Sequence, residues 1–182
     1  MSLDEDLLTR AQQFEPEALQ TLHRQLYQPV YRYIYLKIGD ANASQDLTSD
    51  VFLRMLEALK GGRGWQTTPN AWIFGIARNV VADHYRRRER RPEVELDENA
   101  LPAADPGLAQ TVIAAEEQTA LLAAMEELTD EQRDVVFLRF MEGLSIKDVA
   151  EVMGKTEGAI KALQFRSMQA LSKIMQQKGG DA

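Results

Sequence analysis

The residues with the most distinctive chemistry lie at 63–91, where seven arginines and two tryptophans accompany only two acidic residues. Trp72, Asn79, Asp83 and Arg86 recur at i, i+7, i+11 and i+14, a spacing that places them along one stripe of a helix. Aromatic rings stack on unpaired bases, cations attract phosphates, and an asparagine amide can read a base edge. The block therefore indicates a surface for unpaired nucleic acid. The alternative is that both tryptophans pack in a core and the arginines form a solvated helix end.

A second pattern, IKDVAEVMGKTEGAIKALQF at 146–165, has the form of a helix-turn-helix. Ala150 is small where two helices would cross, Gly154 allows a positive φ in the turn, and Ile160 is an apolar plug between the helices. An ordinary helical hairpin in a core is the alternative. In a helix-turn-helix, the side chains directed at a major groove are those of Thr156, Glu157, Gly158, Lys161, Ala162 and Phe165. Phosphate contacts would come from Lys155, Lys161, Arg166 and Lys173.

The segment 45–59, QDLTSDVFLRMLEAL, has more apolar residues than one core stripe needs. Phe52, Leu53 and Leu56 lie outside the row formed by Leu47, Val51, Met55 and Leu59. Asp46, Asp50 and Arg54 follow one another at i, i+4 and i+8. The excess predicts a contact with a protein partner, although full burial of the helix would give the same pattern.

Catalytic and metal-binding patterns find little support in this sequence. The chain has no cysteine, which excludes disulfides, thiolate zinc sites and thiol catalysis. His23 and His84 lack the spacing of metal ligands, and the glycines at 61–64 connect two predicted helices rather than following a strand. We predict a protein that is not an enzyme and that needs no metal or cofactor.

The elements that must position these residues are helical, because nearly every apolar repeat has three- or four-residue spacing. We expect helices over about 19–34, 45–59 and from 72 into the arginine run, with Pro29 kinking or interrupting the first. Capping signals at Thr129, Ser145 and Thr156 begin helices over about 130–141, 146–153 and 156–176. No segment alternates long enough to predict a strand. The fold class expected is all-α, in two small helical domains.

The net charge of −7 conceals a division of charge along the 182 residues. Seven basic and two acidic residues give +5 at 63–92, whereas one basic and twelve acidic residues give −11 at 93–134. Prolines at 92, 102 and 106, together with the absence of periodicity, predict an acidic linker at 93–118 between domains at 1–92 and 119–178. With no signal peptide and no apolar run of membrane-spanning length, we expect a cytoplasmic protein.

Taken in order, these segments resemble a known family. The order is QDLTSDVFLRML, then W…AWIFGIARNVVADHYRRR, an acidic linker, and LTDEQRDVVFLRFMEGLSIKDVAEVMGKTEGAIKALQFR. It closely resembles the extracytoplasmic-function (ECF) group of bacterial RNA polymerase sigma factors of the sigma-70 family. The resemblance covers roughly residues 15–90 and 119–176. It implies two helical domains, sigma region 2 and sigma region 4, and a function in promoter-specific initiation of transcription.

The resemblance also implies roles for individual residues. Contact with core polymerase, at the clamp helices of β′, falls to Asp46, Asp50, Phe52 and Arg54. Recognition and opening of the −10 element fall to Trp65, Trp72, Arg78, Asn79 and Asp83, with phosphates bound by Arg86, Arg87 and Arg88. The −35 element is read as duplex by Lys155, Thr156, Glu157, Gly158, Lys161, Ala162, Phe165 and Arg166. The implied partners are core polymerase (β′ and β subunits), promoter DNA and an anti-sigma protein.

One departure from the family concerns the recognition helix, which carries Leu163, Phe165 and Met168 where the family usually has basic or polar residues. With Lys161 and Arg166 as the main cations, we expect this domain alone to bind DNA weakly. Two other functions remain open from the sequence. One is a sigma-like mimic or adaptor that binds an anti-sigma protein without binding DNA. The other is a helix-turn-helix repressor with a helical sensor domain.

Overall fold

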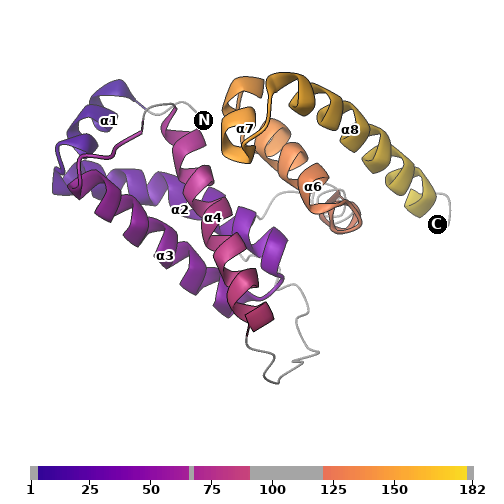
Figure 1. Ribbon diagram of the computed structural model, residues 1–182, viewed down its shortest axis with the longest axis horizontal. Coiled ribbons are helices and arrows are strands. Elements are labelled where there is room, and N and C mark those ends of the chain that lie inside the picture. The colour runs from indigo at the N-terminus through magenta and orange to yellow at the C-terminus, as the bar shows by residue number, and fades with distance from the viewer. Residues whose placement is uncertain (1–3, 66–67, 91–120, 180–182) are drawn as a thin grey trace, which may run out of the picture. The chain divides into compact units, whose positions relative to one another are not determined.

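The computed structural model describes residues 4–65, 68–90 and 121–179, and every regular element in these ranges is a helix (Figure 1). The chain divides into two compact units. The N-terminal unit is built of α1 to α4, and the C-terminal unit contains α6, η1, α8 and most of α7. The all-α fold expected from the sequence is confirmed, while the predicted linker at 93–118 lies outside the described residues.

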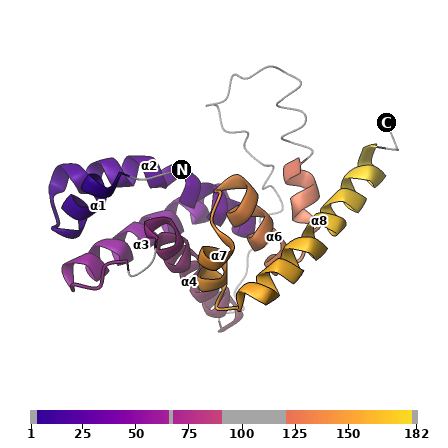
Figure 2. The same ribbon diagram turned by 90° about the horizontal axis from the view of Figure 1, so that it is seen from above.

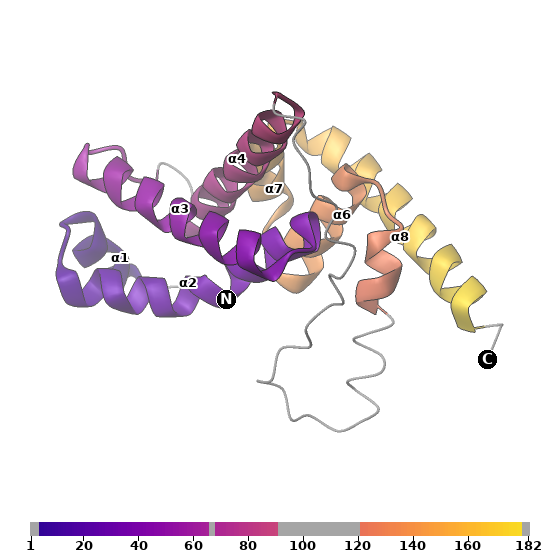
Figure 3. The same cartoon turned by 90° about the horizontal axis from the view of Figure 1, so that it is seen from below.

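The N-terminal unit packs four helices around one core. They are α1 (Glu5–Gln12), α2 (Pro16–Ile38), α3 (Ala41–Lys60) and α4 (Pro69–Arg90). Helix α2 contacts each of the other three, and α3 also packs against α4. Figures 2 and 3 show α1 beside the first turns of α2. The sequence patterns did not predict α1, which is short and held by its two buried residues, Leu7 and Ala11.

The centre of this core is aromatic and aliphatic. Tyr33 of α2 meets Phe74 of α4 edge to face at 5.7 Å between ring centroids, and both side chains are fully buried. Ile34, Met55 and Ile73 are also buried there. Burial of this kind stabilises a fold by about 1.5–3 kcal/mol for each large side chain. The core therefore fixes α4 against both α2 and α3.

Helix α2 runs from residue 16 to residue 38 through Pro29, which is buried within it. The predicted interruption at this proline is therefore wrong. A proline removes one helical hydrogen bond, and the packing of the neighbouring Leu26, Val30 and Ile34 in the core offsets that loss. The helix ends at Gly39, whose φ of 75° is the left-handed conformation that glycine adopts readily.

The C-terminal unit begins with a helical segment at 121–126 and continues with α6 (Asp130–Val136), η1 (Phe137–Met141), α7 (Ile146–Met153) and α8 (Glu157–Gly179). All three predicted caps are present. Thr129 and Gln132 form a reciprocal capping box, the Ser145 hydroxyl accepts from the Asp148 amide at 3.1 Å, and the Thr156 hydroxyl accepts from the Ala159 amide at 3.2 Å. These caps satisfy amide groups that a helix start otherwise leaves without partners.

The predicted single helix over 130–141 is in fact two elements, because its last five residues form the π-helix η1. The Glu142 amide donates to the Phe137 carbonyl at 3.1 Å, and Gly143 follows with a φ of 70°. A π turn inserts one extra residue per turn and so rotates the side chains that follow it. Periodicity over twelve residues cannot reveal so local a change.

Candidate nucleic-acid and protein interfaces

Helix α4 has a buried face and a face available to a partner. Phe74, Ala77, Val80 and Val81 are buried, whereas Asn79 is exposed. The three consecutive arginines Arg86–Arg88 are exposed as well. The core residues hold the helix, and along the predicted stripe Asn79 and Arg86 are exposed whereas Trp72 and Asp83 are half-buried. The arginine run is therefore a positively charged surface at the end of α4.

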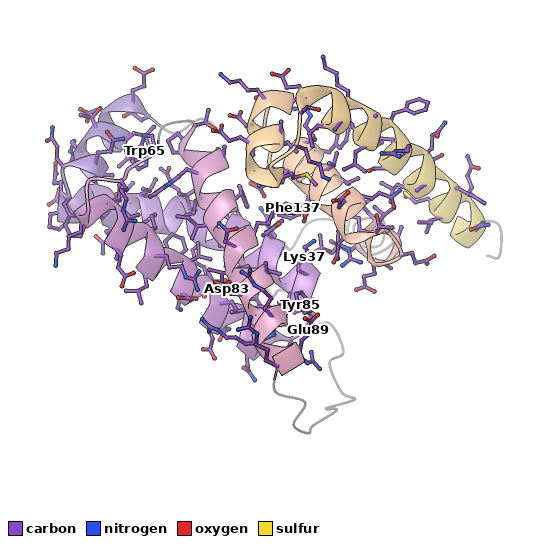
Figure 4. The ribbon with its side chains drawn as sticks, in the orientation of Figure 1. Lys37, Trp65, Asp83, Tyr85, Glu89 and Phe137 are labelled. Carbon is purple, nitrogen blue, oxygen red and sulfur yellow. The ribbon has the colours of Figure 1, made fainter. Side chains whose placement is uncertain are left out.

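The two tryptophans form a pair at the beginning of this stripe. Trp65 lies in the loop after α3 (Figure 4). Its ring meets that of Trp72 of α4 edge to face at 5.7 Å between ring centroids. Both side chains are half-buried. Neither tryptophan is therefore a fully buried core residue, and each keeps part of its surface accessible. An edge-to-face pair of this kind fixes the orientation of both rings.

A chain of four charged side chains joins α3 to α4. The guanidinium of Arg54 donates from Nη1 to Oδ2 of Asp83 at 2.8 Å and from Nη2 to Oδ2 of Asp50 at 3.0 Å. The other carboxylate oxygen of Asp83, Oδ1, accepts from Arg86. The hydrogen bond from Arg54 holds the pKa of Asp83 below its ordinary value, and Arg86 adds to this effect. The structure thus connects residues that the family resemblance divided between polymerase contact and DNA contact.

The basic end of α4 is tied to α2. The Tyr85 hydroxyl donates a hydrogen bond to the main-chain carbonyl of Lys37, at the C-terminal end of α2 (Figure 4). Asp83 is anchored to α3 two residues earlier. These two contacts brace the last turns of a helix whose end carries several like charges, which repel one another.

His84, within the basic end of α4, gives the unit a dependence on pH. Burial lowers the pKa of this imidazole below its ordinary value of 6.5, and the positive charges of Arg88 and Arg87 lower it further. The folded state therefore disfavours the protonated ring. The stability that the neutral ring permits is present above the ordinary pKa and is lost as the pH falls through the lowered folded value.

We expect the urea concentration at the unfolding midpoint of the N-terminal unit, measured by tryptophan emission, to be lower at pH 5.5 than at pH 7.5. The variant His84→Gln should show a clearly smaller fall, because it carries no titrating group at this position. The Asp83 carboxylate does not interfere, since its lowered pKa lies well below this range. Equal pH dependence in both proteins would contradict the prediction.

Helix α3 corrects one predicted polymerase contact. Phe52 is 5% exposed and packs against His23 at 4.5 Å and Tyr27 at 6.2 Å between ring centroids. It is therefore a core residue and not a surface contact. Its neighbour Leu53 is 55% exposed, and Asp46 is exposed as well. Periodicity placed Phe52 and Leu53 alike outside the core row, and the family resemblance chose Phe52 as the contact, whereas the structure buries Phe52 and exposes Leu53.

In the C-terminal unit the helix-turn-helix elements take their predicted places. Gly154 has a φ of 62°, Ile160 is fully buried and Ala150 is buried. Exposed at the start of α8 are Thr156, Glu157, Gly158, Lys161, Ala162, Phe165 and Arg166. Lys155 is half-buried and pairs with Glu131 of α6 at 2.9 Å. To bind DNA, Lys155 must leave the carboxylate of Glu131 and pair with a DNA phosphate instead.

Fewer apolar residues lie on the exposed face of α8 than the sequence implied. Leu163 is 7% exposed, so it belongs to the core and does not replace a basic or polar residue on the exposed face. Phe165 and Met168 are 65% and 41% exposed, and these two are the real apolar residues of that surface. Ser167, between them, is buried and donates to the carbonyl of Leu163 at 2.7 Å.

No three His, Cys, Asp or Glu side chains in 4–65, 68–90 and 121–179 are placed to hold a metal ion. In the same ranges no helix has the length and apolar character to cross a membrane.

The helix-turn-helix of α7 and α8, together with the basic stripe of α4, places the chain in the class of helical DNA-binding proteins. Comparisons with known proteins narrow this class. A model of Sigma-70 region 2 matches residues 21–91, and a model of Sigma-70, region 4 matches residues 118–171. The chain belongs to the ECF group of RNA polymerase sigma factors, and it is a transcription initiation factor.

Individual relatives support this assignment. The chain is 38% identical over 174 residues to the ECF RNA polymerase sigma factor BldN of Streptomyces coelicolor, covering 93% of this chain and 65% of that protein. It is 32% identical to the ECF RNA polymerase sigma factor SigD of Mycobacterium tuberculosis, covering 78% of this chain and 69% of the relative. The sigma factor RpoE of Bartonella quintana, solved with the anti-sigma factor NepR, has the same fold, with a TM-score of 0.70 at 19% identity over 86% of this chain and 96% of that one.

Proposed function

We propose that this chain binds core RNA polymerase through α3, opens and recognises the −10 element through α4, and reads the −35 element through α8. The domain limits proposed are 1–92, 93–118 and 119–178. The observation that carries the proposal is the exposed Asn79 with the arginines of α4 on a helix fixed by its core. The chain supplies recognition and strand capture, while bond formation remains with the polymerase, so we infer that it has no catalytic activity of its own.

The proposed −10 site divides its tasks among three kinds of side chain. Trp65 and Trp72 offer aromatic surface for an unstacked base, and Arg86–Arg88 offer positive charge for the phosphates. Asn79, exposed between them along the helix, has the donor and the acceptor needed to read a base edge. Arg78 is half-buried and is proposed as a supporting residue. Stacking and phosphate contacts together offset the energy of unpairing.

The proposed −35 site is the exposed start of α8. Its first turns carry Glu157, Gly158, Lys161 and Ala162 toward the DNA bases, followed by Phe165 and Arg166. Lys161 and Arg166 are the cations of this surface, so its intrinsic affinity for DNA is low. Tethering to polymerase raises the effective concentration of this surface at the promoter, and this compensates for its low affinity.

We also propose regulation by an anti-sigma protein in the cytoplasm, where core polymerase is found. The proposal is supported by the solved complex of RpoE with NepR, which shares this fold. A mimic that binds an anti-sigma protein without binding DNA would not need an exposed asparagine beside an arginine run. The exposure of Asn79 and Arg86–Arg88 therefore favours the sigma factor over the mimic.

Run-off transcription tests the proposed function. Purified chain is added to core polymerase on a panel of promoters that differ in their −10 and −35 elements. Transcripts that require the chain, and that depend on both elements, are the expected result. Tight binding to an anti-sigma protein without any transcript from a panel of this kind would favour the mimic instead.

The polymerase face of α3 gives a separate prediction. Replacing Leu53 with aspartate is expected to weaken binding to core polymerase about tenfold or more, because an exposed apolar contact becomes a charge that must be desolvated in the interface. Fold stability should change little, since the side chain is 55% exposed. The matched control is Leu122→Asp, at another exposed leucine, 37% exposed and outside the proposed interfaces. Equal loss of binding in both variants, measured by fluorescence anisotropy, would argue against the α3 interface.

A further inference from the structure

The side chain of Arg54 is committed to two carboxylates within its own unit. Its two terminal nitrogens reach Asp83 at 2.8 Å and Asp50 at 3.0 Å, and its side chain is 31% exposed. The contact with Asp83 joins α3 to α4 across 29 positions of sequence. Both terminal nitrogens of this guanidinium are engaged, and its charge is already balanced by two carboxylates of its own unit before any partner protein binds.

Asp83 is an acidic residue on a face that has to accept a polyanion. It follows Asn79 by four positions, so the two side chains are neighbours on the helix. One of its oxygens is held by Arg54 and the other by Arg86. A DNA phosphate near this carboxylate would be repelled, because both groups are negatively charged, unless the arginines neutralise Asp83.

The two arginines around Asp83 differ in how they can respond to DNA. Arg86 is 63% exposed, whereas Arg54 and Asp83 are only 31% and 29% exposed. The inner pair, Arg54 with Asp83, is therefore the persistent contact, and Arg86 is the outer cation that can turn toward a phosphate. While Arg54 neutralises Asp83, the departure of Arg86 leaves no unpaired carboxylate behind.

From this geometry we propose that Arg54 is a positioning residue of the −10 site and not a polymerase contact. It pairs with Asp83, keeps that negative charge away from the DNA, and so releases Arg86 for a phosphate. The inference rests on the proposed function and reassigns both Arg54 and Asp83 within it. In this proposal, the residues of α3 that face polymerase are the exposed Asp46 and Leu53. Asp50, which pairs with Arg54, lies between this polymerase face and the −10 site.

A double-mutant cycle in the full chain tests the proposal. The variants are Arg54→Gln, Asp83→Asn and the two together, with Arg24→Gln, at an exposed arginine of α2, as the matched control. Each is measured for core polymerase binding and for open-complex formation, the latter by permanganate reactivity of unpaired thymines. We expect Arg54→Gln to bind core polymerase within about threefold of the parent chain and to form open complexes about tenfold less well. The double variant should recover to within about threefold, because the uncompensated carboxylate has been removed.

Other results would overturn the proposal. A tenfold loss of core binding in Arg54→Gln without rescue by Asp83→Asn would make Arg54 a polymerase contact, and normal open complexes in Arg54→Gln would deny it a role at the −10 site. If Arg54→Gln does not fold, Arg54→Lys keeps a positive charge that can neutralise Asp83, so it should form open complexes within about threefold of the parent chain, and a tenfold loss in this variant would count against the proposal. Failure of the parent chain to support any transcription would instead count against the proposed function, so the two failures are distinguishable.

Discussion

Replacing Asn79 with alanine is expected to lower open-complex formation by roughly 10- to 100-fold, because a bidentate amide contact to a base is worth about 1–3 kcal/mol. The side chain is exposed on α4, while Ala77 and Val80 beside it are buried, so the backbone at this position is fixed. Binding to core polymerase should stay within about twofold, since we propose that α3, and not α4, makes that contact. The free energy of unfolding should change by no more than about 0.5 kcal/mol.

The measurements separate recognition from assembly. Permanganate reactivity of the −10 thymines follows strand opening, and anisotropy of labelled protein follows core binding. The matched control is Asn42→Ala, which removes another exposed amide, in the first turn of α3. Equal losses of opening and of core binding in Asn79→Ala would show that the residue supports the fold or the assembly instead of reading DNA.

Several features of the fold could be predicted because each depends on neighbours in sequence. The caps at Thr129, Ser145 and Thr156 are set by residues three positions apart, and all three are formed. The turn at Gly154 and the plug at Ile160 follow from the spacing within one motif. Helical periodicity also placed the stripe of α4 correctly. Local chemistry was sufficient at these positions.

The features that could not be predicted depend on contacts between helices. Phe52 and Leu53 are adjacent and both apolar, and only the packing of α3 against α2 decides that the first is buried and the second exposed. Leu163 was placed on the DNA surface for the same reason. The spacing of Asp50 and Arg54 allows an ion pair within α3, but nothing in the sequence indicates that Asp83 of α4 completes it.

The uneven distribution of charge along the chain is explained by the face of α4 that we propose binds the −10 element. The segment 63–92 carries seven basic and two acidic residues, and Asp83, one of the two acids, is neutralised by Arg54. The whole chain nevertheless carries −7, so its long-range field opposes random binding to DNA. With the proposed −10 site, we therefore expect binding to become favourable where polymerase holds the basic face of α4 close to a promoter. This separation of local from net charge suits a subunit that must not compete for DNA while it is free.

Replacing Ile160 with alanine is expected to unfold most of the C-terminal unit. The side chain is fully buried, and removal of an isoleucine side chain from a core costs about 2–5 kcal/mol. A helical unit of fewer than about 70 residues has a total stability of only about 3–5 kcal/mol from a single core. Loss of this one plug is therefore comparable to the whole stability of the unit, and transcription that depends on the −35 element should be lost with it.

Both tryptophans lie in the N-terminal unit, so tryptophan emission follows that unit while circular dichroism follows both. In Ile160→Ala we expect a large loss of helical signal at 25 °C with an unchanged urea midpoint by emission. The control, Phe165→Ala, alters a side chain that is 65% exposed on the same helix. It should keep the helical signal and lose only discrimination among −35 sequences. If Ile160→Ala kept its helical signal as well, Ile160 would not hold α8 in place, and the assignment of 146–165 as a helix-turn-helix would lose its central packing contact.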